Sequence, residues 1–218
     1  MEGILLINKP NGLTSHDVVK VVRKKLGIKR VGHAGTLDPL ATGVLVVLLG
    51  RSTKLFDKFV SFDKVYRATM ILGTTTTSAD VEGRVISKKP YEHLDSRRIQ
   101  EVFERFTGEM EQLPPMVSAV KVNGKKLYQF ARKGIEVKRV PRRILIKSLK
   151  IEEINLPEIR FFVECSKGTY IRQLADDIGQ ALGCGACISQ IERLRVGNFD
   201  IENSVSLDQF NESHIRDW

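Results

Sequence analysis

Runs of apolar residues mark the strands that the chain is expected to bury most deeply. Residues 4–7 and 44–49 are apolar at every position and have the length of a strand. A strand with this pattern is covered on both faces of a sheet. Residues 64–72 alternate instead, which places Tyr66 on one face with apolar side chains. The pattern therefore predicts three strands here, the first spanning residues 3–8.

Further strands are predicted in the second half of the chain. Residues 142–156 and 158–165 are β-rich stretches that meet near Pro157, and this arrangement predicts an antiparallel pair. Shorter strands are predicted over 84–88, 117–122 and 191–197.

Helices are predicted where apolar residues recur every three or four positions. The clearest case begins after Thr14, because Asp17 three residues later completes a capping-box start. Gly27 marks the end of this helix. Comparable signals predict helices over 53–62, over 95–108 with Asp95 as N-cap, over 169–182 with Thr169 as N-cap, and over 207–218.

The succession of strands and helices indicates an α+β chain. It contains no internal repeat, low-complexity tract or linker. We expect residues 1–200 to form one domain and residues 201–218 to form a short C-terminal tail packed on it, with no separate second domain, since so few residues cannot fold independently.

The net charge of the sequence favours an anionic partner. There are 35 Lys and Arg against 26 Asp and Glu, a formal net charge of +9. Such an excess suits nucleic acid, although it also serves solubility. Basic residues gather on the helix after Thr14 and around Tyr128, and either cluster fits a solvated surface as well as a phosphate backbone. The second cluster comprises Lys125, Lys126, Arg132 and Lys133, beside the turn signal Asn123-Gly124.

The three cysteines, at positions 165, 184 and 187, indicate a reducing compartment because they cannot build a disulfide framework. The spacing of Cys184 and Cys187 suits half of a zinc site, but no second pair lies at a matching spacing. We therefore expect packing residues and no metal. The apolar run at 4–7 is too short for a signal peptide or a membrane span, so we expect a cytoplasmic protein.

Residues 31–45 contain the first candidate for chemistry. Glycines at 32, 35 and 43 relax the backbone, and Pro39 keeps Asp38 out of helical geometry. Asp38 is thus predicted to lie on a loop directly before a buried strand. Asp-Pro also commonly opens a turn, so these residues alone favour a turn over a catalytic carboxylate. For Tyr66 the residues alone favour a core tyrosine whose hydroxyl has a partner over a catalytic role.

Arg172 is the second candidate, because it falls in the first turn of a predicted helix. The helix dipole disfavours a cation there by about 0.3–1 kcal/mol, a cost that an anionic partner would offset. The local candidate for that partner is Asp176, and the distant candidate is Asp38.

Five motifs follow one another in the chain. They are Lys9-Pro10 with Gly12, Thr14 and Ser15; Gly32 to Pro39; Tyr66 in Lys64-Val65-Tyr66; Pro114-Pro115 with Ser118-Ala119; and Gly168 to Arg172. Together they resemble the tRNA pseudouridine-55 synthase family, over about residues 3–199. The resemblance implies a pseudouridine synthase fold, in which helices flank a mixed, mostly antiparallel sheet crossed by a central RNA-binding cleft. It also implies an isomerase that uses no cofactor or metal.

The resemblance assigns roles in the reaction residue by residue. Asp38 matches the nucleophilic aspartate, which attacks either the uracil ring or the sugar C1′. Arg172 matches the arginine that pairs with it, and an opposite charge favours the ionised carboxylate. Tyr66 matches the tyrosine beside the target ring, suited first to stacking and hydrogen bonding and second to removing the C5 proton.

Three further residues match positions that bind the nucleotide. Tyr170 and Leu194 match contacts to the uridine, and His33 matches the histidine that fills the gap left when the base is turned out of its stack. Without the resemblance, core packing would explain Tyr170 and Leu194, and a structural role would explain His33. The implied partner is the T-arm stem-loop of tRNA, bound by a monomer.

Two other functions fit the same charge and elements. A non-catalytic RNA-folding module would share both. A nucleoside or glycoside hydrolase would need a second carboxylate as acid, for which Asp80 and Asp177 are the obvious candidates, although neither stands in a recognisable pairing. Bacterial members of the family commonly continue into a small C-terminal RNA-binding domain, for which residues 198–218 are too few.

Overall fold

The computed structural model describes residues 1–122, 124–131 and 133–218, so Asn123 of the predicted turn and Arg132 of the predicted basic cluster lie outside the described residues. The chain forms two compact units. Unit 1 comprises residues 1–67 and 190–218, and unit 2 comprises residues 68–189. Two strands, β4 (Lys64–Leu72) and β12 (Ala186–Val196), contribute residues to both units.

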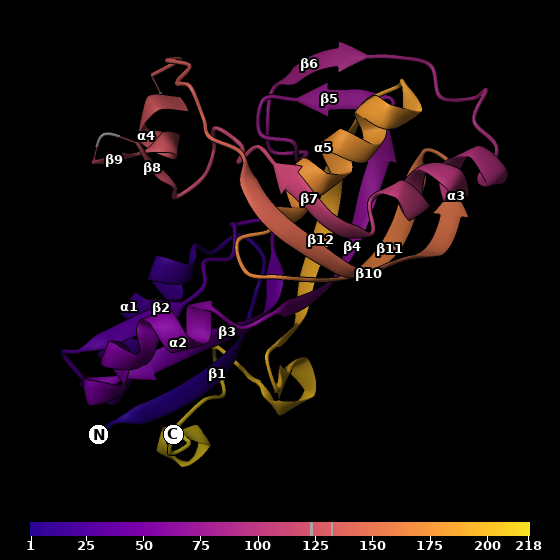
Figure 1. The fold of residues 1–218 in the computed structure, drawn as a ribbon. Helices are drawn as coiled ribbons and strands as arrows, with labels where there is room; N and C mark the ends of the chain where they lie inside the picture. Colours follow the sequence, from indigo (N-terminus) through magenta and orange to yellow (C-terminus); the bar gives the residue numbers. More distant parts are fainter. Residues whose placement is uncertain (123, 132) are drawn as a thin grey trace. The chain divides into compact units, whose positions relative to one another are not determined.

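The sheet of unit 1 is built on the two all-apolar runs (Figure 1). β1 (Gly3–Lys9) pairs antiparallel with β3 (Thr42–Leu49) along its whole length. On the other edge of β3 lie β2 (Val31–Ala34), which is antiparallel to it, and β12, which pairs in parallel through Arg193 and Gly43. These pairings make β3 the central strand of the unit, as its burial predicted.

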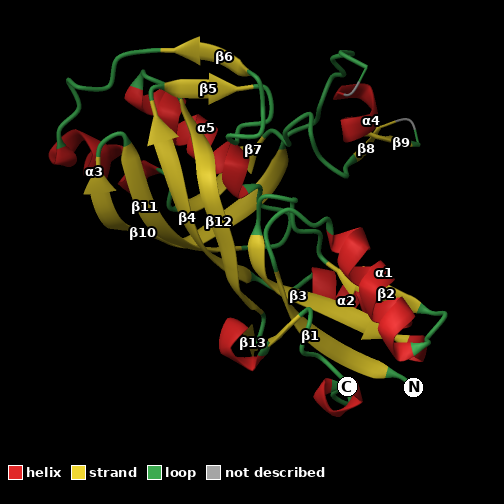
Figure 2. Cartoon of the chain, turned by 180° about the vertical axis from the view of Figure 1, so that it is seen from behind, coloured by secondary structure: helices red, strands yellow, loops and turns green. Residues whose placement is uncertain are grey.

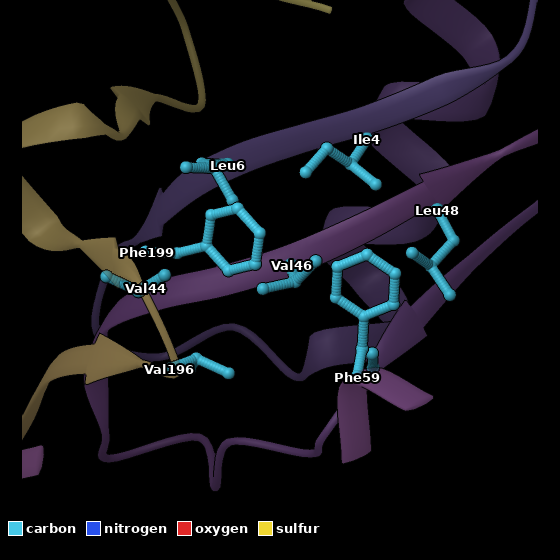
Figure 3. Close-up of a cluster of buried hydrophobic side chains, with 9 residues drawn as sticks. Ile4, Leu6, Val44, Val46, Leu48, Phe59, Val196 and Phe199 are labelled. Carbon is cyan, nitrogen blue, oxygen red and sulfur yellow. The ribbon is translucent and has the colours of Figure 1, made fainter. Parts of the chain in front are cut away.

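A longer helix and two short ones lie between the strands β1 and β4 in the sequence of unit 1. α1 (Ser15–Leu26) has the predicted capping box between Thr14 and Asp17 and ends at Gly27 in the left-handed conformation. The predicted helix over 53–62 is divided between a 3-10 helix, Gly50–Leu55, and α2 (Phe56–Val60). Figure 3 shows the apolar cluster of this unit, in which the rings of Phe59 and Phe199 stack with centroids 5.8 Å apart.

Residues 199–218 are part of unit 1 and pack within it through strand pairing and aromatic contacts. β13 (Phe199–Asp200) pairs with β12, and β14 (Val205–Ser206) runs parallel to β1. Phe210 is fully buried, and the Trp218 ring lies 5.0 Å from that of Phe59 and 5.3 Å from that of Phe199. The predicted helix over 207–218 is wrong, because only Glu212–His214 are helical and form a 3-10 turn.

Unit 2 has a mostly antiparallel sheet in the order β12-β4-β11-β10-β7 (Figure 2). The predicted pair is present, as β10 (Arg142–Asn155) runs antiparallel to β11 (Glu158–Cys165). β7 (Gly108–Gln112) adds to β10 and was not predicted. The remaining elements are α3 (Ser96–Arg105), α5 (Ile171–Leu182), the hairpin of β5 (Thr74–Thr76) and β6 (Val85–Lys88), and a segment with β8 (Lys121–Val122), β9 (Lys125–Lys126) and α4 (Leu127–Ala131).

The core of unit 2 lies between its sheet and two helices. α3 packs against α5 and β10, and the Phe103 ring of α3 meets the Phe161 ring of β11 edge-on at 5.8 Å. The α+β class with mainly antiparallel pairing is therefore confirmed. Among the described residues, no helix is long and apolar enough to cross a membrane.

Candidate active site

Asp38 lies on the loop between β2 and β3, as predicted, and its side chain is half-buried. The residue before it is fixed by α1. Ser15, the first residue of that helix, accepts a hydrogen bond from the Leu37 N–H at 2.8 Å, and its hydroxyl lies 3.1 Å from the Leu37 carbonyl oxygen, to which it donates. Both backbone polar groups of Leu37, the residue before Asp38, are therefore hydrogen-bonded to a buried serine.

The residue after Asp38 is held by a buried lysine. Lys9 is fully buried, and its Nζ donates to the carbonyl oxygens of Pro10 at 2.8 Å, Leu13 at 2.7 Å and Pro39 at 3.1 Å. The Gly12 N–H donates to the same Pro39 oxygen at 2.9 Å. Burying a cation is costly unless it is hydrogen-bonded. The hydrogen bonds of Lys9 and Gly12 connect the first sequence motif to the Asp38 loop.

Three other predicted site residues belong to unit 1 with Asp38. Tyr66 is buried on β4, and Leu194 is half-buried on β12. His33 lies on β2, a strand that the sequence did not predict. The strand forms because residues 31–34 pair with residues 46–49 of β3.

Arg172 belongs to unit 2 and lies in the first turn of α5, where it is buried. Its guanidinium forms an ion pair with Asp80, with Nη1 and Oδ2 3.4 Å apart. It also donates to the carbonyl oxygens of Ser78 at 2.5 Å and Val117 at 2.9 Å. Asp176, the local candidate, accepts from Gln173 at 3.2 Å. The pairing of Arg172 with Asp38 stays a prediction.

Asp80 contacts a predicted site residue, and sequence reasoning missed this contact. It is buried, and its Oδ1 accepts hydrogen bonds from the Ser78 hydroxyl at 2.5 Å and from the Glu82 N–H at 3.1 Å. The loop that carries it is shaped by Ala79, which has a positive φ of 60°. The threonines and serine that precede Asp80 were the available signal for a buried aspartate. Their hydroxyls can donate hydrogen bonds to its carboxylate and to backbone carbonyls of the loop. Asp80 therefore serves as an anchor for Arg172.

Tyr170 stands at the N-cap of α5, a position that the sequence assigned to Thr169. Its backbone is held at both ends by Gln112, whose Oε1 accepts from the Tyr170 N–H at 2.8 Å and whose Nε2 donates to the Tyr170 carbonyl at 3.1 Å. The Thr169 hydroxyl instead donates to the Ser166 carbonyl at 2.9 Å. The N-cap residue is thus held by a side chain from β7, and among the described residues no side chain caps the first turn of α5.

The cysteines are buried and free of disulfides. Burial raises the pKa of the Cys187 thiol to about 11 and also raises the pKa of Cys184. A thiol with a raised pKa is a poor metal ligand and nucleophile. Over the described part of the chain, no cluster of three or more His, Cys, Asp or Glu residues could hold a metal ion.

Comparison with known proteins connects this geometry to a family. Residues 23–171 match the model of the TruB family pseudouridylate synthase N-terminal domain, and residues 172–217 match the tRNA pseudouridylate synthase B C-terminal domain. tRNA pseudouridine synthase B of Clostridium tetani is 46% identical over all of this chain and 75% of its own length. The same-named protein of Syntrophus aciditrophicus is 49% identical over all of this chain and 69% of its own length.

Solved structures agree with the sequence comparison. A chain in the crystal structure of a Cbf5-Nop10-Gar1 complex matches with a TM-score of 0.75 and 32% identity, over 94% of this chain and 52% of that one. A chain of an H/ACA RNP bound to a substrate RNA containing 2′-deoxyuridine matches with a TM-score of 0.70 and 29% identity, over 94% and 51%. This chain therefore spans about half the length of those solved chains.

The α+β fold with mainly antiparallel strands and the match to the family model place this chain in the class of the pseudouridylate synthases. The family match covers well over half of the sequence. This chain belongs to the TruB family of pseudouridylate synthases.

Proposed function

We propose that this chain converts a uridine in the T-arm loop of tRNA, at position 55, to pseudouridine. The relatives that cover nearly all of it are named tRNA pseudouridine synthase B, and the proposal extends their activity to this chain. The observation that carries it is the Asp38 loop, where the backbones of the residues before and after Asp38 are held by buried side chains. Such a loop supplies a nucleophile in a fixed position.

The reaction is an isomerisation and needs no external reactant. The N1–C1′ glycosidic bond breaks, the uracil rotates, and a bond forms between C5 and C1′. The proton on C5 is lost and N1 gains a proton, so atoms and charge balance. Asp38 would attack the ring or the sugar and form a covalent intermediate that divides this change into easier steps.

Arg172 would stabilise the ionised Asp38, and Asp80 would hold Arg172 in place. A buried guanidinium with one carboxylate and two carbonyl partners cannot swing freely, so its position is fixed. Tyr66 would stack on the target ring, Tyr170 and Leu194 would contact the uridine, and His33 would fill the position that the base leaves. The Lys and Arg residues that give the chain its positive net charge would bind the phosphates of the T-arm.

The test uses a T-arm stem-loop transcript that carries tritium at uridine C5. We expect the protein to release tritium to water and to retain the base in the RNA. Asp38→Asn should abolish the release while leaving the dissociation constant for the RNA nearly unchanged. Asp57→Asn, which changes an exposed acid on α2, is the matched control and should behave as wild type.

Each alternative predicts a different result. Release of free uracil would identify a hydrolase, and tight binding without tritium release would identify a non-catalytic RNA-folding module. Tritium release from a transcript with cytidine at position 55 would show that the target lies elsewhere. Any of these results would overturn the proposal.

A further inference from the structure

A second buried cation contacts the Asp38 loop, and the five sequence motifs do not contain it. Arg193 of β12 is only 1% exposed. Its Nε donates to the Val44 carbonyl at 2.8 Å, Nη2 donates to the Gly35 carbonyl at 3.1 Å, and Nη1 donates to the Thr36 carbonyl at 3.4 Å. One guanidinium therefore contacts the loop before Asp38 and the strand that follows it.

The backbone of Arg193 makes a second contact with the same loop. It pairs in parallel with Gly43, whose φ is +98°. A Cβ added at Gly43 would collide with the Arg193 carbonyl oxygen and would lie 2.7 Å from its amide nitrogen. The end of the loop therefore sits directly against the backbone of Arg193, while the beginning of the loop is held by its side chain.

Packing alone does not account for an arginine at this position. A buried guanidinium has a large desolvation cost, and an apolar side chain of similar volume would fill the same space without it. Within the described residues, no carboxylate forms an ion pair with Arg193, so its partners are carbonyl oxygens. The planar, five-donor fork of arginine can reach three carbonyls on two segments at once, and a lysine ammonium cannot reproduce that geometry.

We propose that Arg193 is a positioning residue that holds the Asp38 loop in its reactive conformation. The inference rests on the proposed function. Arg193 ties Gly35 and Thr36 to Val44, so the loop between them cannot shift without breaking hydrogen bonds in a buried site. Side chains alternate along a strand, so Leu194, the proposed uridine contact, leaves β12 on the opposite side. β12 thereby contacts the Asp38 loop through Arg193 and carries the proposed uridine contact, Leu194, on its other side.

The kinetic test compares Arg193→Lys and Arg193→Met with wild type on the tritiated stem-loop. A misplacement of a reacting group by about 1 Å can cost about 10²-fold in rate. We expect Arg193→Met to lower kcat by about that factor, with KM and the RNA dissociation constant within about threefold of wild type. Arg193→Lys should keep part of the rate, because it retains a donor.

A control separates positioning from stability. Val196→Ala creates a cavity in the same strand at a fully buried apolar residue and leaves the Arg193 hydrogen bonds in place. It should reduce the free energy of unfolding and preserve kcat for the folded protein. If Arg193→Met is destabilised no more than Val196→Ala and turns over at the wild-type rate, the inference is wrong.

Hydrogen exchange tests the clamp without reference to activity. Peptides that cover residues 35–41 should exchange faster in Arg193→Met than in wild type, and at the wild-type rate in Val196→Ala. Unchanged exchange in Arg193→Met would overturn the inference. If wild type forms no pseudouridine, the proposed function fails, and the exchange experiment still decides whether Arg193 holds the loop.

Discussion

Asp17 gives a pH-dependent contribution to stability at the scale of one residue. Hydrogen bonds with Thr14 and Lys20 lower its pKa from the ordinary value of 3.8 to about 2. A lowered pKa in the folded state stabilises the protein above the unfolded pKa, and this stabilisation is lost as the pH falls from about 4 towards 2. In urea unfolding, Asp17→Asn should therefore have a lower free energy of unfolding than wild type at pH 6. This difference should shrink as the pH approaches 2. A deficit that is the same at every pH would contradict this assignment.

Asp80 should matter for both stability and turnover because it anchors a buried arginine. Removing one partner of a buried ion pair costs about 3–5 kcal/mol, and Asp80→Asn keeps the size of the side chain while removing its charge. We expect a lower free energy of unfolding and a reduced kcat for the folded enzyme. Asp176→Asn changes an acid on the same helix as Arg172 and should leave both quantities close to wild type. Equal behaviour of the two variants would show that the Asp80 contact has no role.

The sequence predicts the placement of single residues when the cause is local. Asp38 lies on a loop because Pro39 follows it and glycines surround it. The partnership of Arg172 with Asp80 could not be predicted in this way, since the two residues are far apart in the sequence and meet only after the loop that carries Ala79 has folded. Arg193 was missed for the same reason, because its carbonyl partners lie on distant segments.

Elements with local signals were predicted well. α1 begins and ends at its caps, and α5 ends at Gly183 in the left-handed conformation. β2 and β7 were missed because both are short and contain few apolar residues, and each forms by pairing with a longer strand. The helix expected over 207–218 fails because Phe210 is drawn into the core and Arg216 bridges to Ile4. Tertiary contacts there override local propensity.

Gly43 gives the sharpest prediction at the scale of elements. Gly43→Ala adds a side chain at a positive φ and places it against the Arg193 backbone, so it should weaken the pairing of β3 with β12. Gly27→Ala is the matched control, because Gly27 also has a positive φ but a Cβ there meets no atom within 4 Å. Backbone strain alone costs about 1–3 kcal/mol. In urea unfolding, Gly27→Ala should therefore lower the free energy of unfolding by that amount, and Gly43→Ala should lower it distinctly more. Equal losses would mean that the collision is relieved without cost.

At the scale of the whole molecule, the net charge of +9 predicts how RNA affinity responds to salt. Contacts between basic side chains and phosphates release counterions, so the logarithm of the binding constant should fall linearly with the logarithm of salt concentration. We expect a loss of at least tenfold between about 50 and 200 mM salt, measured by filter binding of the stem-loop. Asp38→Asn should show the same slope. A constant affinity over this range would contradict a phosphate-binding surface.

The α+β class could be predicted from the hydrophobic pattern, but the two units could not. β4 and β12 each belong partly to both units, and their sequences show no change of composition where one unit gives way to the other. A boundary that falls inside a strand leaves no glycine, proline or polar linker to mark it. The expectation of one domain over residues 1–200 stays a prediction.

The aromatic packing of residues 201–218 provides a built-in optical reporter. Trp218 is the single tryptophan of the sequence, and its ring contacts Phe59 and Phe199 within unit 1. Its fluorescence emission should therefore report on the folding of that unit, whereas far-UV circular dichroism records both. Superimposable denaturation curves from the two signals would indicate that the two units melt as one, and an earlier change in emission would mean that the unit bearing Asp38 opens first.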